Sequence, residues 1–348
     1  MKLSIVDQSP VPSGSTPADA LHNSIDLARF AERLGYSRYW VAEHHSTPSF
    51  AGSAPEVLIA RLAAETSRIR VGSGAVLLPH YSPMKVVETF RVLHALYPGR
   101  IDLGLGRAPG GNGLDAYALQ RFHSVDERED DFPMQLAELL AFLHKTFPAQ
   151  HPFSRIDLSP DMPGTPEVWL LGSSGWSADA AAQLGLPYAA AHFINPDTTR
   201  RSIEHYYAHF RPSDYLDAPL ALVAAGAICA DTEADAERLA ASQRLRRILR
   251  DRGERESGPV PSPEEAIARF GGPSIPAPQD DSEWPRVFVG SIEKVAEELD
   301  GMARALNLDE LMLITVVHDH AARKRSYQLL AKAFALESEG ETQVGQTT

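Results

Sequence analysis

Eight short apolar runs recur along the chain, and segments with helix signals separate them. The runs are rich in Val, Ile, Leu and Tyr and have no polar face, which is typical of parallel strands covered on both sides. They span residues 3–6, 39–42, 69–78, 101–105, 168–171, 187–191, 220–228 and 310–317. Eight alternating strand–helix units, joined by right-handed crossovers, close most naturally into an α/β (β/α)8 TIM barrel. An open doubly wound sheet is the alternative, and in both folds ligands bind at the carboxyl ends of the strands.

The segments between the runs begin with residues that cap helices. Thr16, Pro17 and Asp19 supply an N-cap, a first-turn proline and an acid at the third position. Further predicted caps are Ser53 with Glu56 and Ser124 with Glu127, which have capping-box spacing, and Ser82, Asn195, Asp231 and Asp319. Ser291 opens one helix more than eight strands need.

These signals predict one barrel domain over residues 1–336, with an excursion between its seventh and eighth strands. The excursion is an insertion at about residues 252–290, where prolines and polar residues are frequent. Residues 337–348 are polar and contain glycine, which predicts a flexible C-terminal tail.

The charge balance argues against several classes of partner. The chain has 33 Lys and Arg residues against 46 Asp and Glu residues, a formal net charge of −13 that repels nucleic acid and anionic lipid. No stretch approaches the roughly 20 apolar residues that span a bilayer, and the first 15 residues contain no export segment. The one cysteine, Cys229, permits no internal disulfide and fits a reducing compartment. We therefore expect a cytoplasmic protein that binds neither nucleic acid nor a membrane.

The second predicted strand ends in Glu43, His44 and His45. An imidazole exchanges protons near neutral pH, so one histidine here suits a general acid or base, or a hydrogen-bond donor to a ring. A structural histidine pair is the alternative, and zinc is less favoured because the HExxH spacing is absent. Adjacent side chains at a strand end point to opposite sides, so we expect His44 alone to face a ligand.

The fifth predicted strand runs into residues 172–175, a turn of glycines and serines that Ser177 and an alanine-rich helix follow. Bare amides and hydroxyls at a helix N-terminus form an anion site, although an ordinary serine-capped helix has the same pattern. The turn lacks the GxSxG spacing of a nucleophile elbow and the Gly-Lys pair of a P-loop. Arg107, which follows the fourth strand, either grips a phosphate or forms a surface ion pair.

Three other patterns are not predicted to be binding motifs. Pro109 breaks the dinucleotide fingerprint that begins at Gly104. Residues 318–320 read His-Asp-His, but Asp319 is a natural helix cap, so no metal site is expected. The basic run Arg244, Arg246, Arg247, Arg250 and Arg252 is predicted to form a solvated helix face.

Three motifs in order, at residues 39–45, 71–79 and 99–107, resemble those of the bacterial luciferase-like, flavin-dependent monooxygenases. The similarity covers almost the whole chain. It implies a (β/α)8 barrel with an excursion near strand seven, and reduced FMN as cosubstrate, supplied by a separate flavin reductase. It also implies O2 as the second cosubstrate and a homodimer that pairs through helices near residues 54–67 and 83–97.

The resemblance also implies roles for particular residues. His44 is the catalytic residue beside the flavin ring, and Glu43 and Ala75 contact the ring largely through their backbone. The Gly74–Ala75 bond matches a cis peptide of the relatives. The phosphate is held by Arg107, Ser174, Gly175 and Ser177. Gly110 and Gly111 replace bulkier residues of the light-emitting members, which argues against light emission and a long-chain aldehyde substrate.

The expected reaction is the oxygenation of a small organic substrate through a C4a-peroxyflavin formed from reduced FMN and O2. One alternative is hydride transfer with deazaflavin F420 in the same kind of barrel, and another is a flavin-binding protein without turnover. A metal-dependent barrel hydrolase is a third. The identity of the substrate depends on loop shape, which a permissive barrel scaffold does not specify.

Overall fold

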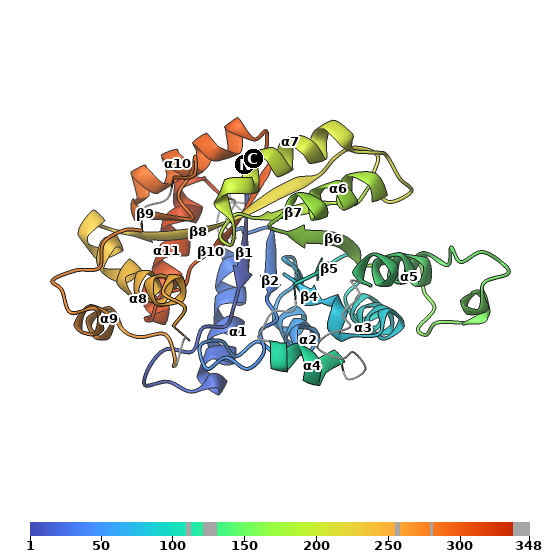
Figure 1. The fold of residues 1–348 in the computed structure, drawn as a ribbon, viewed down its shortest axis with the longest axis horizontal. Helices are drawn as coiled ribbons and strands as arrows, with labels where there is room; N and C mark the ends of the chain where they lie inside the picture. Colours follow the sequence, from blue (N-terminus) through green and yellow to red (C-terminus); the bar gives the residue numbers. More distant parts are fainter. Residues whose placement is uncertain (109–112, 121–130, 255–257, 279–280, 337–348) are drawn as a thin grey trace, which may run out of the picture.

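The computed structural model describes residues 1–108, 113–120, 131–254, 258–278 and 281–336. Helices surround a central sheet of parallel strands (Figure 1). The strands are β1 (Lys2–Asp7), β2 (Arg38–Val41), β3 (Arg70–Ser73), β4 (Val76–Leu77), β5 (Ile101–Gly106), β6 (Glu167–Gly172), β7 (Tyr188–Ala191), β8 (Ala221–Ala230), β9 (Val287–Ser291) and β10 (Glu310–Ile314). The helices are α1 (Pro17–Arg33), α2 (Pro55–Glu65), α3 (Pro83–Leu96), α4 (Gly113–Gln120), α5 (Phe132–His144), α6 (Gly175–Leu184), α7 (Thr199–His209), α8 (Glu233–Asp251), α9 (Pro263–Phe270), α10 (Ile292–Ala305) and α11 (His320–Ala333).

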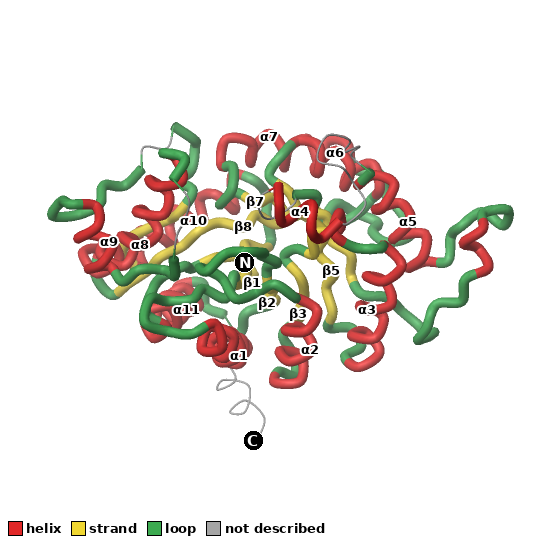
Figure 2. The backbone as a smooth tube through the Cα atoms, turned by 60° about the horizontal axis from the view of Figure 1, so that its bottom comes forward, coloured by secondary structure: helices red, strands yellow, loops and turns green. Residues whose placement is uncertain are grey.

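Eight of the strands form a closed barrel, in the order β1, β2, β3, β5, β6, β7, β8 and β10. The closure is made by β10, because Leu311 is the register partner of Leu3 on one side and of Val223 on the other. Seen obliquely, the strands run through the middle of a ring of helices (Figure 2). The predicted TIM barrel is confirmed, and the open doubly wound sheet is excluded.

The predicted strand at residues 69–78 is two strands. It breaks at the Gly74–Ala75 bond, which is cis, as the resemblance implied. Beyond the break, β4 pairs with β5 through Val76 and Leu105. Before the break, the Ser73 hydroxyl donates to the carbonyl of Gly104 and accepts from its amide, at 2.9 and 3.0 Å. The first half is therefore tied to β5 by a side chain where the backbone ladder is interrupted.

The excursion lies between β8 and β10, the seventh and eighth barrel strands, as predicted. It contains a strand that the sequence did not indicate, β9, which pairs with the second half of β8 from Gly226 to Ala230. The first half of β8 pairs with β10. Because β8 has ten residues, it serves both the barrel and this side extension, and α8, α9 and α10 pack around the extension (Figure 1).

Helix starts follow the predicted caps at most positions. Thr16 and Asp19 form a reciprocal capping box, and the Asp319 carboxylate accepts from the Ala322 amide. Two predictions are wrong. Ala54 is the cap of α2 in place of Ser53, because Pro55 takes the first helical position, and Thr232 caps α8 because Asp231 pairs with Arg325.

Of the remaining predicted caps, three are confirmed and one lies outside the described residues. Ser82, Asn195 and Ser291 are N-caps of α3, of a short 3-10 turn and of α10. Ser124 and Glu127, like Gly110, Gly111 and the predicted tail at residues 337–348, lie outside the described residues.

A cluster of ion pairs closes the amino-terminal end of the barrel. Arg38, at the start of β2, pairs with Asp102, Glu167 and Glu310 at 2.9, 2.9 and 3.1 Å. The indole of Trp40 donates to Asp102 at 2.8 Å, and its ring packs edge-on against Trp169 at 5.4 Å. Burial of these charges is offset by their mutual pairing and hydrogen bonds. The two indoles form the bottom of an apolar interior that continues upward through Leu222, Met312 and Ile314.

Within the described ranges, no helix is both long and apolar enough to cross a membrane.

Candidate functional site

The carboxyl ends of the strands surround a cavity of about 1470 Å³. Its walls include residues at or just after the ends of β2, β5, β6 and β7, and the inner face of β10. The side chains named in the following paragraphs as lining the cavity are Gln8, His44, His45, Phe50, Ala75, Arg107, Ser174, Trp176, Ser177, Gln243, Arg244, Arg246, Arg247 and Arg250. Of the predicted site residues, all except Gly175 line this cavity.

His44 directs its ring into the cavity wall beside Phe50. The two ring centroids are 4.7 Å apart and tilted by 43°. The His44 Nε2 lies 3.5 Å from the side-chain amide nitrogen of Gln8, and the His44 backbone amide donates to Gly52 at 2.7 Å. The backbone bond holds the residue after β2, while the half-buried imidazole reaches the cavity. An imidazole placed in this way can hold or transfer a proton at one ring nitrogen.

Glu43 is buried beside it and is fully engaged by the protein. Its carboxylate accepts hydrogen bonds from His45 Nε2 at 2.6 Å, from the Tyr81 hydroxyl at 2.8 Å and from the Leu77 amide at 3.0 Å. Burial, together with this carboxylate, raises the pKa of Tyr81 above its ordinary value. The Glu43 side chain therefore supports the wall of the cavity, and its backbone is the part that lies toward the interior.

His45 also lines the cavity, but its ring is held by Glu43 and packs edge-on against His80 at 5.6 Å. The two adjacent histidines thus differ in surroundings: His45 is fixed by a carboxylate, and His44 lies against an aromatic ring and an amide.

The cavity wall between β2 and β5 is formed by residues with little or no side chain, Gly74, Ala75 and Gly106. A Cβ atom added at Gly74 would lie 3.1 Å from the Trp40 Cβ and 3.2 Å from Val6 Cγ2, and one added at Gly106 would lie 3.1 Å from the Ala75 methyl. These contacts leave no room for larger side chains. The surface at Gly74, Ala75 and Gly106 is consequently smooth backbone, which a flat ring can approach closely.

The start of α6 and the end of β5 meet at one side of the cavity. Ser174 is the N-cap of α6, and its side chain makes no capping hydrogen bond. The buried Ser177 donates from its hydroxyl to the Ser174 carbonyl at 2.9 Å. The Arg107 guanidinium lies over the Trp176 ring, 4.8 Å from its centroid. Gly175 opens the helix, and a Cβ there would meet no atom within 4 Å. Arg107, Ser174 and Ser177 are thus brought together, with Gly175 next to them.

The prediction that the basic run of α8 is a solvated face is wrong for Arg244 and Arg246, while Arg250 and Arg252 are exposed as predicted. Arg244 and Arg246 are each only 8% exposed. Arg244 pairs with Glu237 through two hydrogen bonds of 2.6 and 2.9 Å, and Arg246 lies over the Phe50 ring. The run alternates with Leu245 and Leu249, which are buried, so arginines beside them flank the packed side of the helix. In the sequence, the alternation of arginines with leucines was the feature that could have indicated a packed helix face.

The His-Asp-His sequence at residues 318–320 does not converge on one point. His318 Nε2 lies 3.1 Å from the Ser13 hydroxyl, and His320 Nε2 lies 2.9 Å from Asp26. In the parts of the chain that the structure covers, no group of three His, Cys, Asp or Glu residues is placed to hold a metal ion.

A closed parallel barrel with a cavity at the carboxyl ends of its strands defines the class of TIM-barrel enzymes, whose active sites lie at that face. The sequence model of the luciferase-like monooxygenase family matches residues 1–307, so the chain belongs to this family. The family resemblance that the three motifs indicated is therefore confirmed.

Individual relatives agree with this assignment. A luciferase-like monooxygenase of Escherichia coli K12 is 41% identical over 326 residues, covering 94% of this chain and 95% of its own. An N-acetyl-S-alkylcysteine monooxygenase of Bacillus subtilis is 37% identical over 336 residues, covering 96% and 98%. The crystal structure of apo-MsnO8 superposes with a TM-score of 0.89 at 47% identity, over 97% of this chain and 99% of that one.

More distant solved structures share the fold alone. The oxygenating constituent of 3,6-diketocamphane monooxygenase from Pseudomonas putida, solved in complex with FMN, has a TM-score of 0.70 at 20% identity over 97% of this chain and 99% of that one. An F420-dependent secondary alcohol dehydrogenase has a TM-score of 0.63 at 14% identity over 97% and 99%. The same barrel thus accommodates both cofactors.

Proposed function

We propose that the chain is a monooxygenase that uses reduced FMN and O2 to oxygenate a small organic substrate. The observation that carries the proposal is that His44, Ala75 and the group of Arg107, Ser174 and Ser177 line one cavity. Its volume of about 1470 Å³ leaves room for a mononucleotide and a small second molecule. The FMN complex of the Pseudomonas barrel supports the choice of flavin.

The phosphate of FMN is assigned to the start of α6. Arg107 offers paired donors on a planar fork, and the first amides of α6 lie at the positive end of the helix dipole. Because Ser174 makes no capping bond, its hydroxyl is available to an oxygen of the phosphate. The open space at Gly175 lets a phosphate approach the helix backbone. The Ser177 hydroxyl, which donates to the Ser174 carbonyl in the structure, would turn its proton to the phosphate on binding.

The isoalloxazine ring is assigned to the smooth wall formed by Gly74, Ala75 and the backbone of Glu43. The apolar interior below it, with Trp40 and Met312, excludes water from the reacting atoms. Reduced FMN, when bound, supplies the electrons that activate O2, by the C4a-peroxyflavin route expected from the sequence.

His44 is the residue proposed to act on the proton of the reacting oxygen species. It is the imidazole that packs against Phe50 and Gln8 in the cavity, while His45 is occupied with Glu43. An imidazole can hold or release a proton at the pH of a cell. His44 is the one side chain to which the proposal assigns a change of protonation state.

The test is a reconstitution in which a separate flavin reductase supplies reduced FMN in air. Oxygenated product and hydrogen peroxide are measured per FMN oxidised, over a panel of small organic substrates. We expect at least one substrate to convert peroxide release into oxygenated product. Anaerobic reduction of F420 by a substrate would favour the hydride-transfer alternative, and reduced FMN oxidised with peroxide alone across the panel would favour a binding protein without turnover.

A homodimer through α2 and α3 completes the proposal. Val57 on α2 and Val92 and Leu96 on α3 are exposed by 67%, 47% and 62%. Exposed apolar side chains on neighbouring helices are typical of an interface between subunits. Light scattering should give twice the mass of 38.0 kDa, and Leu96→Glu should shift the protein toward the monomer. A cytoplasmic location, expected from the single cysteine, stays a prediction.

A further inference from the structure

The cavity has an apolar part that lies inside the barrel. The cavity-lining residues of β1, β7, β8 and β10 all carry apolar side chains: Val6, Ala189, Ala191, Ala224, Met312 and Ile314. Except for Ala191, each of them is at most 6% exposed. By contrast, α8 contributes polar lining residues, among them Gln243 and Arg247. We call the space bounded by the six apolar residues and Trp40 the apolar chamber.

The chamber exists because one layer of the barrel interior is not filled. Side chains fill the interior of a TIM barrel in layers, and bulky branched residues dominate them. The indoles of Trp40 and Trp169 fill the lower layer here. Above them, Ala224 on β8 is the register partner of Ala191 on β7 and of Met312 on β10. Two methyl groups thus stand where larger side chains would close an eight-stranded barrel.

The alanines lie across the barrel from the wall to which the flavin ring is assigned. Around the closed barrel, β8 is four strands from β3 in either direction, so the two strands face each other. Figure 2 shows β8 on the opposite side of the barrel from β3. Because Gly74 and Ala75 directly follow β3, a flat ring against them turns its other face toward Ala191 and Ala224. The chamber is then a slot between the ring and the alanines.

The lining of the chamber suits hydrocarbon and disfavours charge. An apolar cavity offers water too few polar partners to hold it in place. A charge or an unpaired hydroxyl buried there costs free energy, whereas each methylene that leaves water raises the affinity about fourfold. Trp40, which is fully buried and lines the cavity, closes the chamber at its base.

We propose that the chamber binds an uncharged apolar group, a hydrocarbon chain or an aromatic ring, at one end of the organic substrate. Ala191 and Ala224 determine its width, and Met312 limits its length. The polar part of the substrate stays toward the mouth, where Gln8 and His44 line the cavity. This inference rests on the proposed function, because it assigns the substrate to the cavity in which the flavin is proposed to bind.

The dimethylbenzene end of the flavin ring is the competing occupant of the chamber. The structure favours the substrate, because a flat ring already has a matching surface on the other side of the barrel. At Gly74 and Gly106, an added Cβ atom would lie 3.1 Å from Trp40 and from Ala75. That surface is bare backbone, whereas the chamber is lined by side chains that leave a separate space above Trp40.

The experiment measures the binding of neutral alcohols to the chain loaded with oxidised FMN, by calorimetric titration. The probes are 1-butanol, 1-hexanol, 1-octanol and 1,6-hexanediol. We expect 1-hexanol to bind at least about tenfold more tightly than 1-butanol, because two more methylenes leave water. The diol should bind at least about tenfold more weakly than 1-hexanol, because its second hydroxyl enters the chamber without an acceptor.

Two variants change the volume of the chamber in opposite directions. Ala224→Leu fills it and should reduce the preference for 1-hexanol over 1-butanol to about twofold or less, with FMN binding unchanged. Met312→Ala enlarges it and should bind 1-octanol about tenfold more tightly than the wild type does, a gain that misfolding does not produce. Ala18→Leu, the same change at an exposed position on α1, is the control. Circular dichroism checks the fold of each variant.

The inference is overturned if the affinity of the wild type does not rise with chain length, or if Ala224→Leu keeps the wild-type preference. An unchanged affinity of Met312→Ala for 1-octanol also overturns it. So does weaker FMN binding by Ala224→Leu, because the chamber would then hold the flavin ring. Failure of the proposed function shows differently: the wild type would not bind FMN. Titration of the flavin-free chain and of its Ala224→Leu variant with the same alcohols then tests the chamber independently.

Discussion

The carboxylate of Glu43 accepts a hydrogen bond of 3.0 Å from the backbone amide of Leu77. This bond joins the segment after β2 to β4, across the point where the predicted third strand breaks. With His45 and Tyr81 as further donors, one buried side chain holds three segments of the cavity wall. Glu43, next to the proposed catalytic residue His44, is therefore assigned the role of a positioning residue.

Replacing Glu43 with Ala should destabilise the protein by about 2–4 kcal/mol, because three donors in a buried site lose their acceptor. Chemical denaturation at pH 7 measures the free energy of unfolding. Glu88→Ala is the matched control, since its partner Lys85 is exposed and the pair is worth less than about 1 kcal/mol. Equal losses in both variants would contradict the role assigned to Glu43.

His44→Ala should leave FMN binding nearly unchanged and uncouple oxygenation. Loss of a positioned proton donor or acceptor typically slows a reaction by about 10²–10⁴-fold. We expect oxygenated product per FMN oxidised to fall and hydrogen peroxide to rise by the same amount. His22→Ala, at an exposed position on α1, is the control. A product yield equal to that of the wild type would remove His44 from the reaction.

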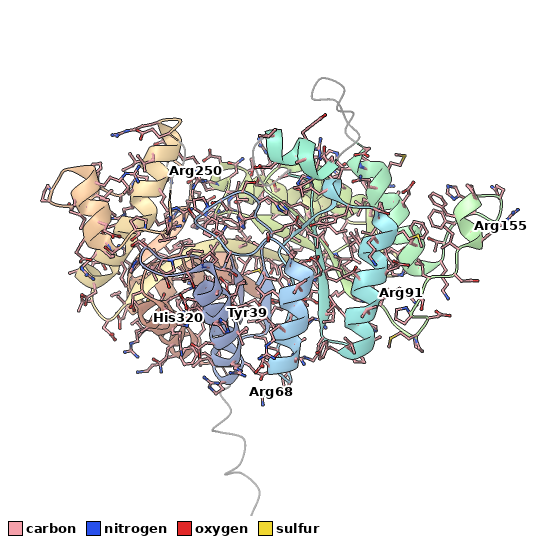
Figure 3. The ribbon with its side chains drawn as sticks, turned by 90° about the horizontal axis from the view of Figure 1, so that it is seen from below. Tyr39, Arg68, Arg91, Arg155, Arg250 and His320 are labelled. Atoms are coloured by element: carbon pink, nitrogen blue, oxygen red, sulfur yellow. The ribbon has the colours of Figure 1, made fainter. Side chains whose placement is uncertain are left out.

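Arg107→Ala should weaken FMN binding by about tenfold or more, the value of a charge-assisted hydrogen bond, and leave riboflavin binding unchanged. The comparison of the two flavins isolates the phosphate, and fluorescence titration measures both. Arg155, exposed on the segment that projects from the barrel (Figure 3), provides a control of equal charge. A parallel loss of both flavins would place Arg107 at the ring, not at the phosphate.

Asp7→Asn should destabilise the protein by about 3–5 kcal/mol at pH 7, because it leaves the buried Arg323 guanidinium without its partner at 2.5 Å. Burial alone would raise the pKa of Asp7, but Arg323 and hydrogen bonds from Ser24 and Tyr39 outweigh it and lower the pKa below 3.8. Asp26→Asn, at a half-exposed pair with Lys324, is the control and should cost less than about 1 kcal/mol.

The pH dependence of this pair has a definite sign. A depressed carboxyl pKa stabilises the folded protein above the unfolded pKa, and this contribution is lost as the pH falls through the folded value. The gap between wild type and Asp7→Asn should therefore be constant from pH 7 to about 5 and narrow below about 4. Denaturation curves at pH 7, 5 and 3.5 measure it, and a gap that widens in acid would refute the pairing as its cause.

The barrel was predictable because its signal is local and repeated. Apolar runs without a polar face, alternating with capped helices such as the one that begins at Thr16, admit few arrangements of parallel strands. The strand β9 was missed because it pairs with an extension of β8, and only two of its five residues, Phe288 and Gly290, are buried. An edge strand of this kind carries no continuous apolar run, so its existence depends on the partner that it finds in space.

Residue types and spacing determined by themselves which chemistry stands at each strand end: imidazoles after the second strand, a guanidinium after the fourth and serines after the fifth. Only the tertiary structure decided how they are used. In it, the Glu43 carboxylate lies in the cavity wall and accepts a hydrogen bond from the Leu77 amide. Arginines of α8 line the same cavity, and Arg246 packs against the Phe50 ring. The physical reason is that a side chain's orientation and partners come from contacts between segments distant in sequence, and no local pattern encodes those contacts.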